Sequence, residues 1–82
     1  MSRDEVFAKV VEIVSPFAKD KDALASVTEE TNILQELKVN SARLVDVNLD
    51  FEDEFDIEVE DEDADAVNTV GDAVQLIGAR IS

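Results

Sequence analysis

Residues 36–47, ELKVNSARLVDV, place the polar pair Asn40 and Ser41 directly before a run with helical periodicity. A serine or asparagine at such a place is the usual N-cap of a helix, because its side-chain oxygen accepts a hydrogen bond from an orphan backbone N–H. A serine hydroxyl is a poor nucleophile without a base. The free amides and the dipole of a helix N-terminus nevertheless favour an anion there. Ser41 is therefore either a helix cap or the acceptor of a phosphate-containing group that another enzyme attaches.

The rest of the chain carries few reactive side chains. Its 82 residues include no Cys, His, Tyr or Trp. This excludes thiolate nucleophiles, imidazole bases and metal sites built from Cys and His. A chain of this length also buries too little surface to build a deep cleft. We therefore expect one domain over residues 1–82 that is not an enzyme and has no catalytic residues.

The acidic segment near residue 61 is a second candidate site. Asp61, Asp63 and Asp65 have the 1, 3 and 5 spacing of a calcium loop, and Asp72 falls at its position 12. Position 6 of such a loop should be Gly, but Ala66 is there, and position 12 should be a bidentate Glu. We therefore predict no specific metal site, only weak divalent binding by crowded carboxylates.

The charge of the chain limits its partners. The net charge is −14, from 21 acidic and 7 basic residues, and residues 44–79 contain no Lys or Arg. Nucleic acids and anionic membranes repel such a molecule, whereas basic protein surfaces attract it. Acidity that serves only solubility is the simpler alternative. Because no secretory leader and no apolar run of membrane-spanning length is present, we expect a cytoplasmic protein without membrane insertion.

Hydrophobic periodicity predicts an all-α fold, a small four-helix bundle of three longer helices and one short helix. The expected helices cover residues 2–15, 41–55 and 61–66, and a last helix opens at residues 69–72, which have capping-box spacing. Pro16 ends the first helix. Residues 18–40 form a long connection that should wrap the bundle, with a helical turn near 22–26 or 33–37.

A helical wheel of residues 41–55 separates two faces. The face expected to join the core consists of Leu44, Val47, Phe51 and Phe55. Val45 and Leu49 point away from it, and Asp46 and Asp53 flank them. This helix should therefore display a small apolar spot ringed by carboxylates, although two scattered apolar residues are also ordinary on a surface.

The run from residue 32 to residue 70, with a Leu-containing segment at 34–37, resembles the acyl carrier protein family of type II fatty acid and polyketide systems. The family's Asp-Ser-Leu attachment motif corresponds to Asn40-Ser41-Ala42. Its acidic helix end, its Asp-x-Glu-Ile/Val sequence and its closing Thr-Val-x-x-Ala-Val sequence correspond to residues 52–55, 56–59 and 69–74. The first helix extends the resemblance to nearly the whole chain.

The resemblance implies a 4′-phosphopantetheine arm on Ser41, installed from coenzyme A by a Mg²⁺-dependent phosphopantetheinyl transferase. The arm's thiol would hold acyl groups as thioesters, which a monomeric carrier delivers to enzymes of a fatty acid, lipid or polyketide-type pathway. The implied docking residues for basic patches on those partners are Val45, Asp46, Leu49, Glu52, Asp53 and Asp61. The implied acyl pocket consists of Leu37, Leu44, Val47, Phe51, Val59, Val67 and Ala73.

The chain departs from the family pattern around the attachment serine. Asn40 replaces Asp, Ala42 replaces Leu, and Arg43 brings a positive charge where the family usually has an acid. Asn48 and Asp50 stand where many carriers have apolar residues. We therefore expect a specialised carrier rather than the housekeeping carrier of fatty acid synthesis. The alternative is an unmodified acidic protein–protein interaction module with the same fold.

Overall fold

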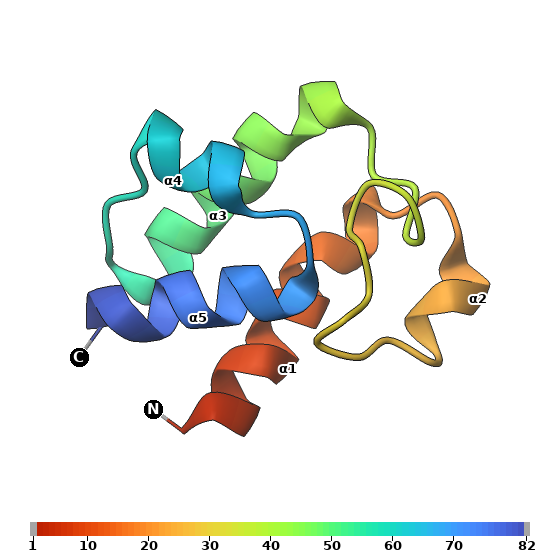
Figure 1. Cartoon of the computed structure of the whole chain (residues 1–82), viewed down its shortest axis with the longest axis horizontal. Helices are drawn as coiled ribbons and strands as arrows, with labels where there is room; N and C mark the ends of the chain where they lie inside the picture. Colours follow the sequence, from red (N-terminus) through yellow and green to blue (C-terminus); the bar gives the residue numbers. More distant parts are fainter. Residues whose placement is uncertain (1, 82) are drawn as a thin grey trace.

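The computed structural model describes residues 2–81, which contain helices and no strand (Figure 1). The helices are α1 (Arg3–Val14), α2 (Lys21–Leu24), α3 (Leu44–Phe55), α4 (Asp61–Ala66) and α5 (Val70–Ile81), and 3₁₀ turns occupy Ser15–Phe17 and Ser41–Arg43. The predicted all-α class is therefore confirmed. Helices α1, α3 and α5 are the three longer ones, and α4 has the predicted bounds. The four-residue helix α2 lies within the long connection.

Helix α1 begins and ends where its sequence predicts. The hydroxyl of Ser2 accepts a hydrogen bond from the backbone N–H of Glu5 at 3.2 Å and caps the first turn. Pro16 lies in the 3₁₀ turn that ends the helix, because proline has no N–H to continue it. The buried residues Val6, Val10 and Val14 follow at intervals of four, so one face of α1 packs against α5.

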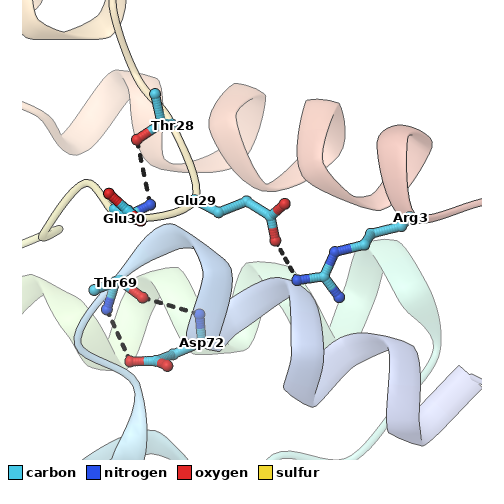
Figure 2. Close-up of polar contacts among 6 residues, drawn as sticks. All are labelled: Arg3, Thr28, Glu29, Glu30, Thr69 and Asp72. Atoms are coloured by element: carbon cyan, nitrogen blue, oxygen red, sulfur yellow. Dashed lines mark hydrogen bonds and ion pairs between the residues drawn. The ribbon is translucent and has the colours of Figure 1, made fainter.

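The start of α5 is a reciprocal cap (Figure 2). The backbone N–H of Asp72 donates to Thr69 Oγ1 at 3.1 Å, and Asp72 Oδ2 accepts from the backbone N–H of Thr69 at 3.1 Å. The same carboxylate accepts from the N–H of Asn68, also at 3.1 Å. These backbone donors, Thr69 first and Asn68 second, lower the pKa of Asp72. The predicted capping box is confirmed.

The long connection returns to the start of α5. Glu29 O accepts from the N–H of Gly71 at 2.8 Å, and Thr31 O accepts from the N–H of Val70 at 3.0 Å. An ion pair between Arg3 and Glu29 adds a contact to α1 (Figure 2). Because these carbonyls meet free N–H groups of the first turn of α5, they satisfy donors that the helix itself cannot. The connection is thereby fixed against the bundle.

The core lies between α1, α3, α5 and the long connection. Its buried apolar residues are Val6, Val10, Val14, Ala18, Ile33, Leu37, Val39, Val47, Phe51, Phe55, Val67, Val70, Ala73, Val74 and Ile77. Three residues of the predicted α3 stripe are among them, but Leu44 is only partly buried. Leu44 is the first residue of α3, so it lies at the edge of the core. None of the helices within residues 2–81 is long and apolar enough to cross a membrane.

Candidate functional site

Ser41 stands at the amino end of α3 with its hydroxyl free. It is the first residue of the 3₁₀ turn that leads into the helix, and its side chain is exposed. The cap is Asn40, whose Oδ1 accepts from the N–H of Ala42 at 2.9 Å. Within residues 2–81 the Ser41 hydroxyl makes no hydrogen bond. The interpretation of Ser41 as the helix cap is therefore wrong, because its neighbour takes that role.

Asn40 can take the cap because its conformation suits it. Its backbone is extended, at φ −63° and ψ 131°, and its carbonyl accepts from the N–H of Arg43 at 2.8 Å. An amide oxygen accepts this bond as a carboxylate would, without the negative charge. The replacement of the family's Asp at this place therefore keeps the geometry of the turn and removes one charge beside Ser41.

A hollow of about 520 Å³ opens beside Ser41, between α3 and α4. Its other lining residues are Leu44, Val45 and Asn48 from α3, and Asp61, Ala64 and Asp65 from α4. A second hollow of about 140 Å³ shares four of these residues. Its lining is Val45, Asn48, Leu49, Glu52, Val59, Asp61 and Ala64. We name the two together the α3–α4 trough.

The predicted docking residues fall into two groups. Val45, Leu49, Glu52 and Asp61 all line the α3–α4 trough. Val45 and Leu49 are 65% and 53% exposed, unlike the other large apolar residues of the described chain. Asp46 and Asp53 lie on α3 outside the lining of the trough. The helix therefore presents two bare apolar side chains beside carboxylates, as the wheel predicts.

Arg43 is a cation on this acidic surface. Its side chain is 65% exposed, and its Nη1 lies 3.3 Å from Oδ2 of Asp46, one helical turn further on. An exposed pair of this kind contributes little stability. It does offset the charge of Asp46, the predicted docking carboxylate that follows Ser41 first in the sequence. The amino end of α3 therefore presents a weaker negative field than the remainder of the helix.

The predicted acyl-pocket residues also separate in the structure. Leu37, Val47, Phe51, Val67 and Ala73 are buried in the core. Leu44 and Val59 are only partly buried, and they line the first and the second hollow of the trough. Five of the predicted pocket residues therefore lie in the closed core, and the other two lie at an open surface.

Sequence reasoning missed Asn48, Ala64 and Asp65 as neighbours of Ser41. The signal for Asn48 was present, because residues at i and i+7 of a helix lie on the same face. Ala64 and Asp65 come from α4, and nothing in the sequence says which face of α4 meets α3. Their placement depends on tertiary packing.

The acidic segment does not assemble a metal site. Among residues 2–81 no group of three acidic side chains is arranged to hold a metal ion. Asp63 pairs with Arg80 at 2.5 Å, and Asp72 serves as the cap of α5. Asp61, Asp63 and Asp65 belong to a helix rather than to a loop that wraps a cation. Asp63 and Asp72 therefore have structural partners that differ from those a calcium loop would give them.

Comparison with known proteins agrees with the resemblance in the sequence. Residues 8–77 match the family model described as "Phosphopantetheine attachment site". The acyl carrier protein of Lactobacillus acidophilus is 42% identical over 78 residues, which is 94% of each chain. That of Thermotoga maritima is 39% identical over 98% of this chain and 96% of its own. The solved acyl carrier protein of Enterococcus faecalis superposes with a TM-score of 0.78, at 38% identity, over 96% of this chain and 98% of its own.

Proposed function

Since this chain belongs to the acyl carrier protein family, we propose that Ser41 holds 4′-phosphopantetheine and that the protein carries acyl groups on it as thioesters. The observation that supports Ser41 is that it is exposed and that its hydroxyl does not cap the helix, because Asn40 does. The chain has five serines, and Ser41 is the one at the amino end of α3. It also lies inside the matched range of residues 8–77.

The residues around Ser41 fit a phosphodiester-linked arm. An anion on the Ser41 oxygen lies at the amino end of a helix, where backbone N–H groups lack intrahelical partners. The adjoining hollow gives an arm room to lie against the protein. The bound arm supplies a thiol, which a chain without Cys cannot provide itself. The Asn40 side chain caps the first turn, and the exposed Ser41 makes no side-chain hydrogen bond within residues 2–81.

The acidic surface of α3 and α4 is the proposed docking site for partner enzymes. Six residues form it: Val45, Asp46, Leu49, Glu52, Asp53 and Asp61. Carboxylates steer basic patches into place and set specificity, while two bare apolar side chains add modest affinity. A phosphopantetheinyl transferase and the acyl-handling enzymes are the proposed users of this surface. Such weak, steered contacts suit a carrier that must leave each enzyme after delivery.

A long acyl chain is proposed to enter the bundle among the predicted pocket residues. Leu44 and Val59 lie at the edge, and the buried members lie behind them. Because Leu37, Val47 and Phe51 are at most 1% exposed, these side chains must move apart to admit an alkyl chain.

We infer a monomeric, non-catalytic carrier that works in the cytoplasm, in a specialised lipid or polyketide-type pathway. The departures at Asn40, Ala42 and Arg43 support the specialised assignment. Arg43 supports it most, since it places a positive charge two residues after Ser41.

Intact-mass measurement tests the proposal. The protein is incubated with a phosphopantetheinyl transferase, coenzyme A and Mg²⁺, and we expect a mass gain of one phosphopantetheinyl group. Ser41→Ala should show no gain, whereas Ser26→Ala, at an exposed serine outside α3, should gain the group like the wild type. A wild-type chain that stays unmodified while an established carrier is modified would favour the alternative, an unmodified interaction module.

A further inference from the structure

Asn48 is the asparagine whose side chain is left without a partner. The chain has four asparagines. Asn32 Oδ1 accepts from the N–H of Gln35 at 2.8 Å, and Asn40 Oδ1 accepts from the N–H of Ala42 at 2.9 Å. Asn68 Nδ2 donates to the carbonyl of Ala66 at 3.5 Å. Within residues 2–81 the amide of Asn48 makes no such bond, although the residue is partly buried.

This free amide lies in the middle of the α3–α4 trough. Asn48 lines both hollows, together with Val45, Asp61 and Ala64. No fully buried side-chain nitrogen or oxygen in residues 2–81 lacks a partner, so the Asn48 amide is open to the trough or to solvent. Between two apolar neighbours on α3, it offers one N–H₂ donor and one oxygen acceptor to whatever occupies the trough.

The trough begins at Ser41 and follows one face of the helix. Asn48 and Glu52 are four residues apart and lie on the same side of α3, and Ser41, in the 3₁₀ turn before the helix, lines the same trough. With a rise of 1.5 Å per residue, Asn48 lies about 10 Å and Glu52 about 16 Å beyond Ser41 along the axis. A group anchored at Ser41 would therefore meet the Asn48 amide before it reaches the far end of the trough.

The length and chemistry of the arm match this arrangement. From phosphorus to sulfur it spans roughly 13 bonds at about 1.2 Å each, or about 16 Å when extended. Its second amide group comes after roughly 9 to 10 bonds, about 11–12 Å from the phosphorus. That amide falls opposite Asn48, and it offers the complementary donor and acceptor. Because the arm is tethered at Ser41, even a weak contact has a high effective concentration.

We propose that Asn48 is a positioning residue that holds the arm of the modified protein in the α3–α4 trough, through hydrogen bonds with the arm's second amide group. This inference rests on the proposed modification of Ser41. The resting arm then lies outside the bundle, and its thiol lies near Glu52 and Val59 at the far end of the trough. A partner enzyme must displace the arm from the α3–α4 trough before it can reach the thiol.

The first test uses nuclear magnetic resonance on the ¹⁵N-labelled protein before and after modification. We expect the side-chain NH₂ signals of Asn48 to shift on modification, with contacts between them and the arm's methylene protons. The NH₂ signals of Asn32 and Asn68, which lie outside the trough, should stay in place and serve as internal controls. Unmoved Asn48 signals in a protein shown by mass to be fully modified would overturn the inference and leave the role of Ser41 intact.

The second test measures how fast the arm's thiol reacts with a small neutral disulfide. Asn48→Leu keeps the size of the side chain and removes its hydrogen bonds, so the free arm should gain population roughly 2- to 10-fold and react faster by a similar factor. Asn48→Gln should restore part of the protection. Asp50→Leu, at an exposed position of α3 that does not line the trough, is the matched control and should react like the wild type.

These outcomes separate the two proposals. Equal thiol rates in the wild type and in Asn48→Leu would overturn the role of Asn48 while the mass gain still supports Ser41. If the wild type takes up no arm at all, both proposals fall together. A general loosening of the fold in Asn48→Leu would shift signals throughout the bundle, whereas loss of the arm contact shifts signals along the trough.

Discussion

Asn40 and Ser41 have different roles at the amino end of α3. Asn40 caps the first turn, whereas the exposed Ser41 makes no side-chain hydrogen bond within residues 2–81. Asn40→Ala should therefore cost about 1 kcal/mol of stability, which lowers the Tm by roughly 4–8 °C in a domain of this size. Ser41→Ala should leave the Tm nearly unchanged. Thermal unfolding followed by circular dichroism checks both variants, and equal losses would mean that Ser41 shares the cap.

The carboxylate of Asp72 predicts how stability changes with pH. Its pKa is lowered in the folded protein by the N–H groups of Thr69 and Asn68. The stability that it adds is therefore present above the pKa of an unfolded Asp, about 3.9, and is lost as the pH falls through the lower folded value. Asp72→Asn should be less stable than the wild type at neutral pH. Urea unfolding at several pH values should show that the difference in unfolding free energy between the wild type and Asp72→Asn shrinks in acid. A difference that stays constant down to about pH 2 would contradict the lowered pKa of Asp72.

Arg43 predicts partner selectivity at the residue scale. Its exposed guanidinium neutralises Asp46, so it weakens attraction to a basic partner near Ser41. Arg43→Asp should therefore be modified severalfold faster by a general phosphopantetheinyl transferase at low salt, mainly through faster association. Initial rates at low and high salt measure the effect. Equal or slower modification of the variant would show that the charge at this place does not limit recognition.

At the scale of elements, the long connection approaches α5 so closely at Gly71 that a side chain there would clash with it. A Cβ atom at Gly71 would lie 2.7 Å from the backbone oxygen of Glu29, whereas one at Gly78 would meet nothing within 4 Å. Gly71→Ala should therefore push residues 28–31 away from α5 and cost roughly 1–3 kcal/mol. Gly78→Ala should stabilise the helix by up to about 1 kcal/mol. Denaturant unfolding of these two variants should give changes in unfolding free energy of opposite sign. A stabilised Gly71→Ala would contradict the close contact between Gly71 and Glu29.

The sequence predicted the elements that repeat a local pattern. Helices α1, α3 and α5 were found because their apolar residues recur at helical spacing, and Thr69 with Asp72 marked the start of α5. The path of the long connection could not be predicted, because its bonds join residues far apart, such as the N–H of Ile33 to Asn68 O at 3.0 Å. Whether Asn40 or Ser41 caps the turn could not be predicted for another reason. Both residue types are good caps, and only the backbone conformation decides which one serves.

At the scale of the whole molecule, charge acts against compactness. Residues 44–79 carry 13 acids and no base, within a chain of net charge −14. Their mutual repulsion should fall as cations accumulate around the folded protein. We expect the Tm to increase with millimolar Mg²⁺ and, at higher concentrations, with NaCl. An unchanged or lowered Tm under Mg²⁺ would show that the acids are already well separated or paired.

The same charge is expected to orient the molecule toward basic partners. The α3–α4 trough, whose first hollow is lined by Ser41, is also lined by the acids Glu52, Asp61 and Asp65 and by the exposed Val45 and Leu49. A basic partner drawn to the trough would meet Ser41, the proposed attachment residue, at the same time. Four of the six proposed docking residues, Val45, Leu49, Glu52 and Asp61, thus line the same trough as Ser41.

The attachment of the arm to Ser41 is tested most directly by fragment mass spectrometry of the modified chain. After reaction with transferase, coenzyme A and Mg²⁺, the protein is cleaved and each serine-containing fragment is sequenced. We predict that the whole added mass is found on Ser41 and that the fragments with Ser15 and Ser26 remain unchanged. Added mass on another serine, or a bare Ser41 beside a fully modified control carrier, would contradict the central claim.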